Sequence, residues 1–70
     1  MDTSATHPAA FLRLTKVISR TGLSRSTIYQ RIEDGEFPPQ IRLGANSVGW
    51  LEAEIDDWIA SRIKQSRKAH

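Results

Sequence analysis

Two glycines limit how the first half of this 70-residue chain can fold. Gly22 and Gly35 suit the positive φ angles at which helices commonly end, so any helix in this region must be short. Ser24 follows the first glycine and is a favourable N-cap, which predicts a helix that runs to about Asp34. Thr15 is the expected N-cap of an earlier helix of less than two turns. Two short helices joined by a tight glycine turn form a helix-turn-helix unit.

Extended chain and a hairpin are expected after the second helix. Pro38 and Pro39 are incompatible with helix, and residues 40–43 alternate as in a strand. The sequence GANS at 44–47 supplies turn residues, and VGWL at 48–51 supplies a returning strand. This segment therefore predicts a small β wing beside the two helices.

A third helix is expected from about Glu52 to Arg67. Its apolar residues recur at spacings of three and four and form one stripe, which consists of Leu51, Ile55, Trp58, Ile59 and Ile63. The preceding segment FLRL at 11–14 suits a short strand or extended chain. The predicted fold is therefore mainly α with a small β hairpin, arranged as a winged helix-turn-helix.

Length and composition bound the class of protein. Seventy residues suffice for one small domain, and we assign residues 1–10 to a flexible leader, 11–64 to the winged helix-turn-helix domain and 65–70 to a basic tail. Cysteine is absent, which excludes disulfides and thiolate metal sites. Neither a signal peptide nor an apolar run near the roughly 20 residues of a membrane helix is present. A soluble, cytoplasmic protein without a membrane partner is expected.

The net charge of +2 hides an uneven distribution. Residues 11–50 carry six basic and three acidic side chains (+3), residues 51–61 carry four acidic ones (−4), and residues 62–70 carry four basic ones (+4). Local positive potential of this kind is compatible with nucleic-acid binding.

The predicted second helix has two different faces. Ile28 and Ile32 define its core side, and the far side carries hydroxyls, an amide and the carboxylates of Glu33 and Asp34, with long side chains on its flanks. The residues that we assign to DNA binding there are Arg25, Ser26, Thr27, Tyr29, Gln30 and Arg31. Hydroxyls approach phosphates and bases closely, glutamine bonds adenine, and arginine bonds guanine or phosphate. An ordinary solvated helix is the alternative. The glycine turn, the downstream hairpin and the hydroxyl-rich start SRST favour a surface that reads the major groove of DNA.

The predicted wing adds Arg42, Asn46 and Ser47 at or near the hairpin tip, where side chains can reach phosphates or a minor groove. Asn46 serves turn geometry equally well. Three aromatic residues, Phe37, Trp50 and Trp58, are expected to pack in the core rather than to stack on single-stranded bases.

The sequence offers no pattern for catalysis, metal binding or a cofactor. The acidic residues that begin the third helix, Glu52, Glu54, Asp56 and Asp57, suit the helix dipole and solubility. His7 and His70 lie near the chain ends without another ligand at metal-binding spacing. No nucleophile has an evident base, so no catalytic residue is assigned and the protein is not expected to be an enzyme.

Four segments, RLTKVISRTGLSRSTIY, IEDGEFP, IRLGANSVGW and EIDDWIASRI, together resemble the AlpA family of small prophage-associated transcriptional regulators, which have a MerR-like winged helix-turn-helix and relatives among excisionases. The resemblance covers about residues 11–63. It implies binding to promoter or attachment-site DNA, with Arg25 to Arg31 in the reading helix and Arg42, Asn46 and Ser47 in the wing. Family members often carry a cation at the wing tip, where this chain has Ala45 and Asn46.

Three functions follow as hypotheses. The first is a sequence-specific regulator of transcription that binds double-stranded DNA next to the nucleoid and, as the resemblance implies, controls an integrase or excisionase gene of a prophage or mobile element. The second is an excisionase-like architectural protein that bends DNA. The third, from another class, is a protein-interaction adaptor that touches no DNA. Because a domain of this size reads few base pairs, a homodimer or a cooperative multimer on DNA would suit the first two hypotheses.

Overall fold

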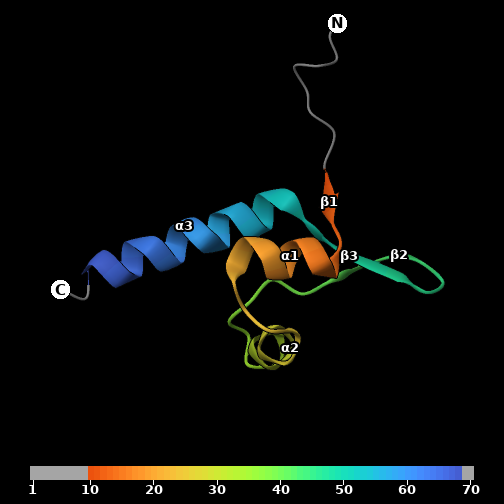
Figure 1. Cartoon of the computed structure of the whole chain (residues 1–70), viewed down its shortest axis with the longest axis horizontal. Coiled ribbons are helices and arrows are strands. Elements are labelled where there is room, and N and C mark those ends of the chain that lie inside the picture. Colours follow the sequence, from red (N-terminus) through yellow and green to blue (C-terminus); the bar gives the residue numbers. More distant parts are fainter. Residues whose placement is uncertain (1–9, 69–70) are drawn as a thin grey trace, which may run out of the picture.

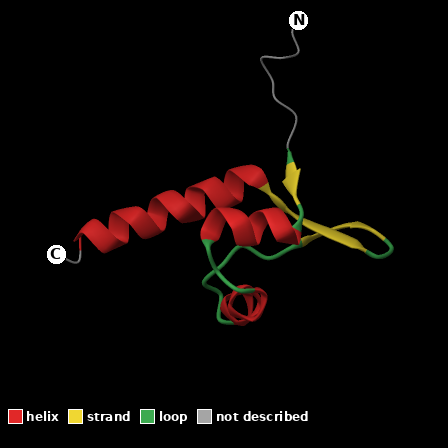
Figure 2. Cartoon of the chain, viewed as in Figure 1, coloured by secondary structure: helices red, strands yellow, loops and turns green. Residues whose placement is uncertain are grey.

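The computed structural model of the chain describes residues 10–68. Three helices and three strands follow in the order β1 (Phe11–Leu12), α1 (Leu14–Thr21), α2 (Arg25–Glu33), β2 (Ile41–Gly44), β3 (Ser47–Leu51) and α3 (Glu52–Lys68). The β2–β3 hairpin extends to one side of the helices, and α3 extends to the other (Figures 1 and 2). The predicted mainly helical, winged helix-turn-helix fold is confirmed.

The start of α1 differs from the prediction. The helix begins at Leu14 rather than after Thr15, with Arg13 at the N-cap position and no capping side chain among the described residues. The Arg13 carbonyl accepts from the backbone N–H groups of Lys16 and Val17 at 2.9 and 3.0 Å, so the backbone alone closes the first turn. The helix has 8 residues, which is slightly more than two turns rather than less.

The turn between α1 and α2 depends on Gly22 and Thr21. Gly22 has φ 75°, as predicted, and its N–H donates to the Ile18 carbonyl at 2.8 Å. The Thr21 hydroxyl donates to the Val17 carbonyl at 2.8 Å and accepts from the Leu23 N–H at 3.2 Å. Side chain and backbone thus fix the direction in which the chain enters α2.

Both predicted ends of α2 are confirmed. Ser24 is the N-cap, and its Oγ accepts from the backbone N–H of Thr27 at 3.2 Å. At the other end Gly35 has φ 74° and donates to the Ile32 carbonyl at 3.1 Å, while the Glu36 N–H donates to the Arg31 carbonyl at 2.8 Å. These two bonds form a Schellman motif, which satisfies carbonyls that the helix end would otherwise leave free.

The sheet has one more strand than the predicted hairpin. β3 lies at its centre, paired antiparallel with both neighbours, and Leu12 of β1 lies opposite Trp50. In the hairpin Gly44 pairs with Ser47, so the turn consists of residues 45–46 rather than 44–47, and Ser47 belongs to the strand. An irregularity between Arg42 and Gly44 shifts the register near the wing tip.

The core takes one buried side chain from each of five segments of the chain. The buried residues are Val17 of α1, Ile28 of α2, Phe37 of the connecting segment, Trp50 of β3 and Ile55 of α3. Trp58 and Ile59 pack partly buried against this cluster, so the prediction that the aromatic residues belong to the core is confirmed. Ile63 continues the predicted apolar stripe but is 47% exposed, because it lies beyond the region where α3 meets the domain.

The N-terminal end of α3 is tied to the rest of the domain. The Glu52 N–H donates to the Ala10 carbonyl at 2.8 Å. Arg20 of α1 forms ion pairs with Glu52, at 3.0 Å, and with Asp56. The helix then continues to Lys68, so the predicted range of about Glu52 to Arg67 is confirmed and residues 65–68 of the expected basic tail belong to it.

Candidate nucleic-acid interface

Ser26 and Gln30 lie on the outer ridge of α2, which also carries the exposed side chain of Glu33. Both are exposed, whereas Ile28, between them in sequence, is fully buried on the opposite side of the helix. Both also line two open depressions, one shared with Thr27 and Arg31 and the other with Tyr29. A hydroxyl and an amide one turn apart on a ridge can enter a groove that a flat surface cannot reach.

The hydroxyls at the start of α2 serve the helix as well as its surface. Ser24 Oγ donates to Thr27 Oγ1 at 2.9 Å while accepting the Thr27 N–H, and Ser26 Oγ lies 3.4 Å away. Capping therefore explains Ser24 and part of the role of Thr27, whose own hydroxyl proton remains available to a ligand. Ser26 is the hydroxyl least committed to the cap.

Gln30 is held by a neighbouring carboxylate. Its Nε2 lies 3.4 Å from Asp34 Oδ1, one turn further along the helix. This bond is long, so exchanging it for a bond to a base costs little. The Gln30 amide is therefore available to a base edge.

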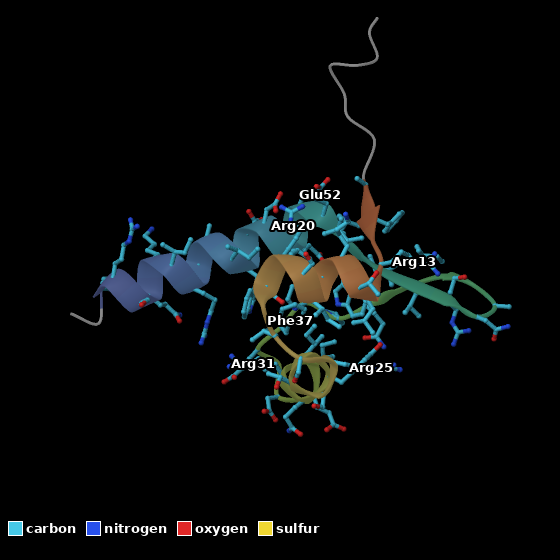
Figure 3. The ribbon with its side chains drawn as sticks, viewed as in Figure 1. Arg13, Arg20, Arg25, Arg31, Phe37 and Glu52 are labelled. Carbon is cyan, nitrogen blue, oxygen red and sulfur yellow. The ribbon has the colours of Figure 1, made fainter. Side chains whose placement is uncertain are left out.

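Arg25 and Arg31 lie on opposite flanks of α2 (Figure 3). Arg25 is exposed on the flank toward the hairpin, and Arg31 is half-buried on the other flank. A helix in a major groove has a sugar-phosphate backbone on each side, so one cation on each flank matches the two rows of phosphates.

Tyr29 lies closer to the core than the other residues predicted for this surface. Its ring is half-buried and meets Trp50 edge to face, with centroids 6.3 Å apart and an interplanar angle of 61°. The geometry assigns its ring to packing between α2 and β3. A role of Tyr29 in reading bases stays a prediction.

The three wing residues lie around the hairpin tip. Arg42 is exposed on β2, and its Nη1 donates to the Ala45 carbonyl across the turn at 3.4 Å. Asn46 is an exposed turn residue, and Ser47 is half-buried at the start of β3. The structure therefore brings one cation and one amide to the end of the wing, away from the ridge of α2 (Figure 1).

Two arginines have roles that the sequence reasoning missed. Arg20 is paired with acidic residues on the side of the domain away from α2, so its charge does not add to that of the exposed surface of α2 (Figure 3). Arg62 of α3, by contrast, lines the same depression as Ser26 and Arg31. The missed signal was spacing, since Arg62 follows Ile55 and Trp58 at intervals of seven and four and so lies beside the apolar stripe of its helix.

Residues 10–68 form neither a metal site nor a membrane span. This range contains no group of three His, Cys, Asp or Glu side chains arranged to hold a metal ion. No helix in it combines the length and the apolar character needed to cross a bilayer.

Known proteins match most of the chain. The family described as "Prophage CP4-57 regulatory protein (AlpA)" matches residues 10–63. The "Uncharacterized protein ORF88" of Enterobacteria phage P4 is 48% identical over 60 residues, covering 86% of this chain and 68% of the phage protein. The "DNA-binding transcriptional activator AlpA" of Escherichia coli (strain K12) is 48% identical over 59 residues, covering 76% of this chain and 84% of that protein.

Proposed function

The chain belongs to the AlpA family of prophage regulatory proteins, and on that premise we propose that it is a transcriptional regulator that binds specific double-stranded DNA. The observation that carries the proposal is the ridge of Ser26 and Gln30 on α2, with an arginine on each flank. A ridge of short polar side chains between two cations complements a groove between two phosphate rows.

The residues of α2 divide into two roles. Ser26, Thr27 and Gln30 discriminate between bases, because hydroxyl and amide groups bond the donors and acceptors of base edges. Arg25 and Arg31 hold phosphates and set the register of the helix on the duplex. Tyr29 supports the surface from behind through its contact with Trp50.

The wing contributes less charge than the helix. Arg42 contacts a phosphate, and Asn46 and Ser47 add hydrogen bonds beside it. Because Arg42 is the cation of this group, the wing adds about one phosphate contact to the total.

The biological role follows from the family. We assign DNA binding to residues 11–64 and a non-enzymatic role to the protein. The function named for the Escherichia coli relative favours activation of transcription. The target we propose is an integrase or excisionase gene of a prophage. Two or more copies of the protein bind adjacent sites on this DNA, in the cytoplasm and associated with the nucleoid.

Selection of bound sequences from a randomised duplex pool tests the proposal. We expect one enriched motif, and log affinity for it should fall with log salt concentration at a slope of several units, about −0.9 per phosphate contact. Enrichment of no motif, together with salt-independent or undetectable binding to duplex, would exclude the proposed function. Migration of circularly permuted fragments that carry the motif then reports whether the protein bends its site.

A further inference from the structure

The depression beside α2 has a wall from a third element. Its lining comprises Ser26, Thr27, Gln30, Arg31 and Asp34 of α2 and its C-terminal end, Glu36 of the following segment, and Arg62 of α3. All residues so far proposed to contact DNA lie in the helix-turn-helix or in the wing, and α3 belongs to neither. A cation from α3 at the edge of the reading helix therefore has no assigned partner.

The Arg62 guanidinium is held in place without being neutralised. Its Cζ lies 5.5 Å from the ring centroid of Trp58, and its Nη1 donates to Gln65 Oε1 at 3.4 Å. Trp58 is itself anchored, because its Nε1 donates to the Glu36 carbonyl at 2.8 Å. Within residues 10–68 Arg62 forms no ion pair, and the residue is exposed. Arg20 shows the opposite arrangement, because it forms ion pairs with two carboxylates.

We propose that Arg62 binds a backbone phosphate on the flank of α2 that faces α3, next to Arg31, so that α3 is a third DNA-contacting element. This inference rests on the proposed function. Arg25 lies on the hairpin side of α2 and Arg31 on the other side (Figure 3), and Arg62 lines the same depression as Arg31. Arg25 therefore serves one phosphate row, and Arg31 and Arg62 serve the other. A guanidinium stacked on an aromatic ring loses little rotamer freedom on binding, because its direction is already set.

The acidic residues of the depression define where the phosphate lies. Asp34 and Glu36 occupy the end of the depression beyond the last turn of α2, while Ser26 and Thr27 lie near the first turn. A phosphate is repelled by the first pair and accepts hydrogen bonds from the second. The contact therefore lies on the side of Arg31 away from Asp34 and Glu36, between Arg62 and the hydroxyls.

The test uses three variants of the full chain and the motif selected from the duplex pool. Arg62→Gln removes the charge but keeps a polar stem, and Arg62→Lys keeps the charge but loses the planar stack. Arg67→Gln is the matched control, because Arg67 lies on the same helix but lines a separate depression with Ile63 and Lys64. Circular dichroism melts of all variants ensure that binding is measured on folded protein.

We expect the slope of log affinity against log salt for Arg62→Gln to be about 0.9 smaller in magnitude than that of the wild type. The ratio of wild-type to variant affinity should therefore be about eight times larger at 0.1 M salt than at 1 M salt. Arg62→Lys should keep most of the wild-type slope, and Arg67→Gln should keep all of it. Equal slopes for the wild type and Arg62→Gln, or equal losses in Arg62→Gln and Arg67→Gln, would overturn the inference while leaving the proposed function intact. A wild-type chain that binds no duplex would overturn both.

A neutral methylphosphonate walked along each strand locates the contact. One substitution should weaken the wild type about as much as Arg62→Gln does, and should have no further effect on that variant. Additive losses at every position would show that Arg62 touches no single phosphate.

Discussion

The Trp58 indole nitrogen donates to the Glu36 carbonyl at 2.8 Å, although the two residues are 22 positions apart. The bond joins α3 to the segment directly after α2. The Trp58 ring also meets the Phe37 ring edge to face, with ring centroids 4.8 Å apart. Glu36 also closes α2 through its own N–H. Trp58 of α3 therefore fixes both the end of α2 and the position of α2 relative to α3.

Replacing this indole should loosen α2 locally. We expect Trp58→Phe to lower the free energy of unfolding by about 1–3 kcal/mol, because the smaller ring buries less area and leaves the Glu36 carbonyl without its partner. For a domain of this size each kcal/mol corresponds to roughly 4–8 °C in melting temperature. Melting measures the loss, and hydrogen exchange at the Gly35 and Glu36 amides should accelerate. Unchanged exchange at these two amides would show that the bond does not hold the turn.

Gly49 should be intolerant of a side chain. A Cβ at this position would lie 2.8 Å from Leu43 Cδ1 and 3.2 Å from the Leu12 carbonyl oxygen. The leucine can move aside, but the β1 backbone cannot without disturbing its pairing with β3. We therefore expect Gly49→Ala to destabilise the domain by about 1–3 kcal/mol, as overpacking does.

Gly44 provides the matched control for this prediction. An added Cβ there meets Ser47 at 3.9 Å, which is ordinary contact, so Gly44→Ala should change stability by less than about 0.5 kcal/mol. Urea denaturation of the two variants measures the difference. Equal stabilities would mean that the sheet adapts to the added methyl group.

Features set by neighbouring residues were the most predictable from the sequence. Ser24, Gly22 and Gly35 act through hydrogen bonds and φ angles within a few positions, and the structure has each of them in its expected role. The predicted N-cap role of Thr15 was wrong for the opposite reason. The register of α1 is set by where β1 ends at Leu12, and that depends on pairing with a strand almost forty residues later.

Features set by distant contacts could not be read in this way. The pairing of β1 with β3, the ion pairs of Arg20 with α3 and the approach of Arg62 to α2 each join segments separated by 30 or more positions. Periodicity placed the faces of each helix but did not specify which neighbour each face meets. The exposed ridge of α2 was predictable, whereas the contribution of α3 to the depression beside it was not.

The two roles proposed for α2 residues make different binding predictions. Gln30→Ala should cost roughly 1–3 kcal/mol on the selected motif and little on random duplex, because a base contact carries sequence discrimination. Arg25→Ala should weaken both duplexes and reduce the salt slope by about 0.9, because a phosphate contact does not depend on sequence. Fluorescence anisotropy with both duplexes separates the effects. A folded double variant that binds the motif as tightly as the wild type would rule out α2 as the reading helix.

Variants of Tyr29 distinguish a packing role of its side chain from a role in DNA binding. Because its ring lies against Trp50, Tyr29→Ala should lower the free energy of unfolding by about 1–3 kcal/mol, somewhat less than a fully buried aromatic residue would. Tyr29→Phe keeps the ring and removes only the hydroxyl, so it should preserve both the stability and the affinity for the selected motif to within about twofold. Melting and anisotropy on the two variants decide between the roles. If Tyr29→Phe kept its stability but lost tenfold or more in affinity, the hydroxyl would be a DNA contact and the packing role would be incomplete.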